Sequence, residues 1–82
     1  MGFSSQEFAI ATAIGRGELS LVERAGRFGN FYAIADSAGT IEVCDTAGEA
    51  HSRIRDLRER ALNAGNADLY NGCDAILTRW VA

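Results

Sequence analysis

The clearest hydrophobic pattern in the sequence lies between Thr46 and Gly65. Four apolar residues recur there at intervals of four, three and four positions, which places them in one stripe along a helix. They are Ala50, Ile54, Leu57 and Ala61. Thr46 and Glu49 have the spacing of a capping box, and Gly65 stands where a left-handed C-terminal cap is expected. The pattern predicts a helix over residues 47–64.

A second helix is predicted over residues 67–80, with Asn66 as its N-cap. Its apolar residues form two adjacent rows, a broader face than in the first helix. The rows are Leu69, Cys73, Ile76 and Trp80, and Tyr70, Leu77 and Val81. We therefore expect this helix to pack against both the first helix and a sheet. Gly72 lies inside it, and a close approach of the two helices would explain a residue that costs about 1 kcal/mol relative to alanine.

The first 45 residues carry the pattern of short strands joined by short turns. Runs of alternating hydrophobicity, the period of a strand, are separated by glycine-containing segments. The runs cover residues 8–14, 18–24, 31–36 and 40–44. Ser37-Ala38-Gly39 between the last two matches a hairpin connection.

Residues 5–14 also fit a helix, because Ser4 and Glu7 have capping-box spacing and alanine favours helices. We prefer the strand, since larger side chains alternate with alanine throughout this run. The predicted fold is then α+β: an antiparallel β-meander of three to four strands followed by an αα-hairpin packed on one face, in a single domain over residues 1–82.

The charge is negative overall and unevenly distributed. The net charge is −3, and all eight basic residues are arginine. Residues 1–50 hold three Arg and seven Asp or Glu, a balance of −4, whereas residues 51–82 hold five and four, a balance of +1. A negative chain argues against tight, unspecific nucleic-acid binding, which rests on neutralising phosphates. The acidic front half favours a protein partner with a basic surface.

Three acidic residues of the predicted sheet are the preferred partner-binding site: Asp36, Glu42 and Asp45. We expect them to form an acidic patch that steers and docks a basic surface. Glu49 lies nearby, but the helix cap uses it. Four arginines lie on the first predicted helix, at positions 53, 55, 58 and 60. Three of them are expected to pair with acidic residues four positions away, as Glu49–Arg53, Arg55–Glu59 and Asp56–Arg60.

No catalytic or cofactor-binding motif is present, so we expect neither an enzyme nor a bound metal or cofactor. Cys44 and the single histidine, His51, are the nearest approach to a nucleophile and base, on either side of a strand-to-helix junction. Two cysteines are too few for a disulfide framework. With no membrane-length apolar run and no signal-peptide pattern, the expected location is the cytoplasm, without membrane contact.

Nucleic-acid binding through a loop and a strand is the alternative function. Arg24, Arg27, Phe28 and Tyr32 combine guanidinium groups for phosphates with rings for stacking on bases. By alternation, at least one of Phe31 and Tyr32 must face the core. A homodimer that shares the broad face of the second helix is a third possibility, so the chain is expected to be a monomer or a homodimer.

In size, acidic charge and α+β pattern, the whole chain resembles the small inhibitors encoded by phages and mobile elements, anti-CRISPR proteins among them. This resemblance implies a stoichiometric inhibitor that blocks a nucleic-acid-handling surface of its target. We therefore predict a small acidic protein-interaction module that binds a basic partner surface.

Overall fold

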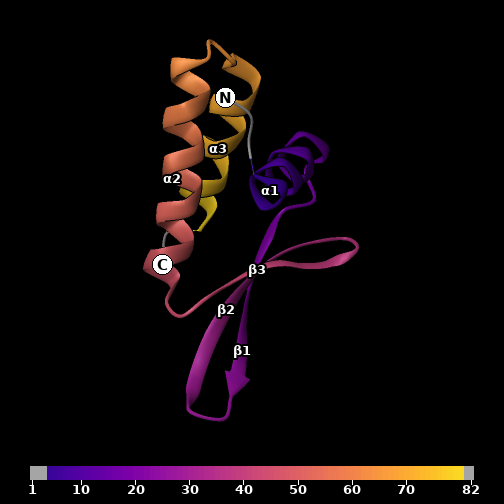
Figure 1. Ribbon diagram of the computed structural model, residues 1–82, viewed down its shortest axis with the longest axis vertical. Coiled ribbons are helices and arrows are strands. Elements are labelled where there is room, and N and C mark those ends of the chain that lie inside the picture. Colours follow the sequence, from indigo (N-terminus) through magenta and orange to yellow (C-terminus); the bar gives the residue numbers. More distant parts are fainter. Residues whose placement is uncertain (1–3, 81–82) are drawn as a thin grey trace.

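The computed structural model describes residues 4–80, so Val81 of the second apolar row lies outside the described part. The elements follow in the order α1 (Ser5–Arg16), β1 (Ser20–Gly26), β2 (Gly29–Asp36), β3 (Gly39–Cys44), α2 (Ala47–Asn63) and α3 (Ala67–Arg79). The strands form an antiparallel meander in the order β1-β2-β3, and α2 packs against α3. Figure 1 shows the three helices gathered at one end, with the β1–β2 hairpin projecting from the other.

The strand predicted for residues 8–14 is wrong, because this segment belongs to α1. Ser4 and Glu7 form both halves of a capping box, with the Ser4 amide donating to Glu7 Oε1 at 3.0 Å and the Glu7 amide donating to Ser4 Oγ at 3.2 Å. Gly17, at φ 70°, ends the helix in the left-handed conformation. The apparent alternation hid a helical face, since Ile10 and Ala13 lie three positions apart and both are buried.

The other predicted elements are confirmed with shifted ends. The three remaining strands form the meander, and both C-terminal helices end one residue before their predicted limits. Thr46 accepts a hydrogen bond from the Glu49 amide at 3.1 Å, although the Glu49 carboxylate accepts from the Asp45 amide instead of closing the capping box. Gly65 takes the left-handed conformation, at φ 72°.

The core lies between the helices and one face of the sheet, which we call the inner face. The predicted stripe of α2 is fully buried, with each of its four residues at most 2% exposed. The sheet contributes Leu21, Ile34, Ile41 and Cys44 to this cluster, and Leu19 joins it from just before β1. Val22, Ala33 and Val43 are paired across the strands and point to the opposite, outer face, which contributes nothing to the cluster.

Three arginines of α2 form ion pairs with three neighbouring elements. Arg53 pairs with Glu42 of β3, Arg58 with Asp74 of α3 at 2.7 Å, and Arg60 with Glu7 of α1. The sequence predicted pairs within α2 at four-residue spacing. Arg53 and Arg60 pair with other elements because α2 packs against α3 and the sheet, and because Glu7 of α1 lies within reach of Arg60.

Gly72 allows α1 to approach α3 closely. A Cβ atom added at Gly72 would overlap the Cγ2 methyl group of Ile14. The close approach predicted at this glycine therefore exists, but the neighbouring helix is α1 and not α2. The contact ties the N-terminal helix to the C-terminal one.

We predict that Gly72→Ala lowers the free energy of unfolding by about 1–2 kcal/mol. The added methyl group overpacks against a stiff β-branched side chain, at a cost of about 1–3 kcal/mol, against a gain in helix propensity of at most about 1 kcal/mol. Gly15→Ala is the matched control, because a Cβ atom added there would have no other atom within 4 Å and the change should stabilise α1. Urea unfolding measures both. Equal stabilisation by the two changes would show that α1 and α3 are not in close contact.

Candidate functional site

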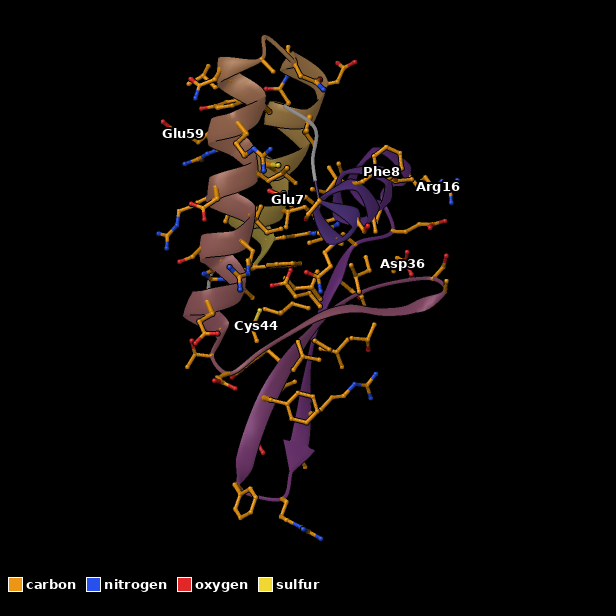
Figure 2. The ribbon with its side chains drawn as sticks, viewed as in Figure 1. Glu7, Phe8, Arg16, Asp36, Cys44 and Glu59 are labelled. Carbon is orange, nitrogen blue, oxygen red and sulfur yellow. The ribbon has the colours of Figure 1, made fainter. Side chains whose placement is uncertain are left out.

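The three residues of the predicted acidic patch do not share one surface. Glu42 points to the inner face, where it is ion-paired with Arg53 and its side chain is 11% exposed. Asp36 lies at the β2–β3 turn and accepts hydrogen bonds from the Ala38 and Gly39 amides at 2.8 and 3.1 Å. Asp45 follows the other end of β3, about 20 Å away at the usual rise of a strand. Figure 2 shows this separation, with Asp36 and Cys44 at opposite ends of the strand.

Most carboxylates of the acidic front half are engaged inside the molecule. Within described residues 4–50, six of the seven carboxylates accept a hydrogen bond or form an ion pair, and only the carboxylate of Asp45 does neither. The six are Glu7, Glu18, Glu23, Asp36, Glu42 and Glu49. For Glu7, the bond from the Ser4 amide and the contact with Arg60 hold the pKa of the carboxyl below its ordinary value.

The arginines of the same segment show the opposite behaviour. Arg16, Arg24 and Arg27 have no hydrogen bond or ion pair with any residue between positions 4 and 80. The side chains left available for a partner in this half are therefore mainly cationic, although its net charge is negative.

Two of these arginines lie on the part of the β1–β2 hairpin that leaves the core. Residues 23–30, which we call the hairpin arm, are all exposed, whereas residues 33–35 farther along β2 are buried. Gly26 pairs with Gly29, so Arg27 and Phe28 form a two-residue loop at the tip. Phe28 is 97% exposed. Figure 1 places this end of the hairpin far from all three helices.

The register of the strands separates the residues proposed for nucleic-acid binding. Arg24 is paired with Phe31, and both point to the outer face. Tyr32 is paired with Glu23 and with Cys44, which is part of the core, so Tyr32 points to the inner face. Of the predicted set, Arg24, Arg27 and Phe28 remain together on the arm and Tyr32 does not. Phe31 takes its place, and counting in twos from the buried Ile34 is the sequence signal that distinguishes the two rings.

Phe31 has a structural role at the base of the arm. A Cβ atom added at Gly26 would lie 3.2 Å from the ring of Phe31 and 2.7 Å from the carbonyl oxygen of Gly29. The ring thus covers the bare backbone of Gly26 from the opposite strand. On the other face, Asn30 Nδ2 donates to Glu23 Oε2 at 2.6 Å. Together these contacts brace the arm outside the core.

The thiols and the histidine are placed for packing. Cys44 and Cys73 are at most 2% exposed. Burial raises the pKa of Cys73 to about 11, and burial followed by the charge of Glu42 raises the pKa of Cys44. The His51 ring stacks on Trp80 with 6.2 Å between ring centroids, and its buried Nε2 has no hydrogen-bond partner among residues 4–80.

The described residues bring together no group of three or more His, Cys, Asp or Glu side chains that could hold a metal ion. None of their helices has the length and apolar character to cross a membrane. Comparison with known proteins adds no identification, since no family model, no curated protein and no solved structure matches the chain. The hairpin arm is therefore the candidate functional site on geometry alone.

We predict that neither thiol reacts with a thiol reagent in the folded protein at pH 8, because the reactive species is the thiolate and both groups are held protonated and buried. Complete denaturation should make both cysteines react. Absorbance of the released reagent group measures the rates, and Cys44→Ala assigns them. Fast labelling of Cys44 in the folded state would contradict the structure and return this thiol to consideration as a nucleophile.

Proposed function

We propose that the protein is a non-catalytic interaction module that acts by occupying a surface of a protein partner, as a stoichiometric inhibitor does. The observation that carries the proposal is the hairpin arm, which presents Arg24, Arg27 and the exposed ring of Phe28 outside the core. Neither arginine has an ion pair or hydrogen bond with a residue between positions 4 and 80. Arginine and aromatic residues are enriched at protein–protein interfaces and among the residues that dominate binding energy.

The acidic residues support this function less well than the arm does. Docking through Asp36, Glu42 and Asp45 would require Glu42 to leave Arg53 and would engage positions at two ends of β3. The net negative charge still matters at long range, because it disfavours approach to other acidic surfaces. The arm supplies the contacts, and the charge of the body limits which surfaces come near.

Nucleic-acid binding by the same arm is the second candidate function, favoured by the exposed Phe28 beside two unpaired arginines. Apolar wedges flanked by arginine insert between bases in several DNA-binding proteins. Two or three phosphate contacts provide little affinity on a chain of net charge −3. A protein partner is therefore the stronger proposal, since a few residues can dominate such an interface.

A capture experiment followed by a titration tests the function. We expect tagged protein to retain one partner from a lysate of the source cells, in equal molar amount and unchanged by nuclease. The purified partner, titrated with the protein, should lose its activity linearly until one equivalent has been added. The tag alone is the control.

Loss of the retained material on nuclease treatment would contradict the proposal and favour the nucleic-acid function. In that case, binding to a mixed oligonucleotide pool should weaken steeply with added salt. Retention of no partner at all would remove the interaction module itself.

A further inference from the structure

The two hairpins of the sheet make their turns with the same backbone plan. Each has two residues between a pair of opposed positions, Gly26 with Gly29 and Asp36 with Gly39. In each, the glycine after the loop carries the positive φ, 131° at Gly29 and 135° at Gly39. No other residue type between positions 4 and 80 has a positive φ. Because these glycines take the positive φ, the two loop residues before each of them do not need to be glycine or asparagine.

The side chains of the two loops differ sharply. The second loop is Ser37-Ala38, and Asp36 before it accepts hydrogen bonds from two amides of the turn. This is ordinary turn chemistry with small or polar residues. The first loop has Gly26 in the position of the aspartate and Arg27-Phe28 in place of the small pair. The turn itself therefore needs neither the guanidinium group nor the aromatic ring.

The fold gives the tip a braced support and a separate electrostatic environment. Phe31 covers Gly26 and Asn30 is bonded to Glu23, so the arm is ordered before it meets a partner. Preorganisation of this kind lowers the entropy lost on binding. The arm also lies at one end of a molecule 41 Å long (Figure 1). At physiological salt, charges separated by more than about 8 Å are largely screened, so the charges of the arm itself determine the potential at the tip. These are Arg24 and Arg27 against Glu23, which leaves the arm net positive.

We propose that the tip is the contact point of the module: Phe28 enters an apolar pocket on the partner protein, and Arg24 and Arg27 donate hydrogen bonds to carboxylates at the rim of that pocket. This inference rests on the proposed function and specifies its partner. The ring of Phe28 gains most free energy on binding by leaving water, and an apolar recess in a protein surface removes the largest part of it from water. A guanidinium group matches a carboxylate with two parallel hydrogen bonds, which makes an acidic rim the complementary protein surface.

The first experiment uses a photo-crosslinking residue, p-benzoylphenylalanine, in place of Phe28. Irradiation in nuclease-treated lysate should attach the chain to one protein, and mass spectrometry should map the link to apolar residues with Asp or Glu close by in the partner structure. The same residue in place of Phe8, which is 65% exposed on the outer side of α1, is the matched control and should give no such product (Figure 2). Links from position 28 to a basic or flat polar surface would overturn the inference.

The second experiment transplants the loop of the second hairpin, as the double substitution R27S/F28A. The turn geometry is already used with Ser-Ala in this chain, so the thermal unfolding midpoint should stay unchanged. The partner identified by crosslinking is then purified without the crosslink and titrated with R27S/F28A in a calorimeter. We expect its affinity for the variant to be about 30-fold weaker or more, as for loss of a dominant interface residue. Phe28→Leu should retain part of the affinity, and Phe8→Ala should bind like the unchanged protein.

The outcomes separate this inference from the proposed function. A partner that binds R27S/F28A as tightly as the unchanged protein would leave the interaction module standing and overturn the role of the tip. Tip-dependent binding to an oligonucleotide pool, without a protein partner, would overturn both. If R27S/F28A loses both its affinity and its folded state, the single variants Phe28→Ser and Arg27→Ser are measured instead. If both single variants are folded and bind with unchanged affinity, the inference is overturned.

Discussion

Burial of the apolar stripe of α2 is the interaction on which the rest of this structure depends. It places two large side chains, Ile54 and Leu57, between two alanines, Ala50 and Ala61. The sheet, α1 and α3 each contribute residues to the core around this stripe. Arginines along its edges then pair with an acidic residue of each neighbour. Exposed pairs of this kind contribute little free energy, so the apolar stripe provides the stability and the ion pairs orient the packing.

The same packing explains why one hairpin projects. The helices contact β2 and β3, and among the described residues the core has none from the hairpin arm. A two-stranded hairpin is marginal by itself. The arm is held by the ring of Phe31 over Gly26 and by the bond between Asn30 and Glu23. Structure maintained outside the core in this way, with large side chains at its tip, is better explained by a partner than by folding.

Local signals predicted the C-terminal half of the fold, while tertiary context decided the rest. Caps and a four-three-four spacing located α2 and α3 within a residue at each end. At the N-terminus, alternation and a capping box conflicted, and the box was the better guide because it satisfies specific backbone groups. Strand alternation showed that one of two adjacent rings faces the core. Counting in twos from Ile34 selects Tyr32, and the pairing of Tyr32 with Cys44 of β3 shows it. The partners of the α2 arginines lie on other elements, so they depend on tertiary packing and could not be predicted from the spacing of charges within one helix.

The number of charges in a segment was also a poor basis for predicting the candidate site, because it does not include tertiary contacts. The sequence shows how many charges a segment holds, and the structure shows which of them are already bonded. Between residues 4 and 50 most carboxylates are bonded, whereas the three arginines have no bonded partner in the described part of the chain. The net charge of this segment is therefore negative, although its side chains without a partner are mainly cationic. Such a molecule approaches an acidic site favourably only if the arm can enter while the negative body stays beyond the screening length. A recess satisfies that condition better than the flat, extended phosphate surface of a duplex, because the arm reaches into a recess while the body remains outside.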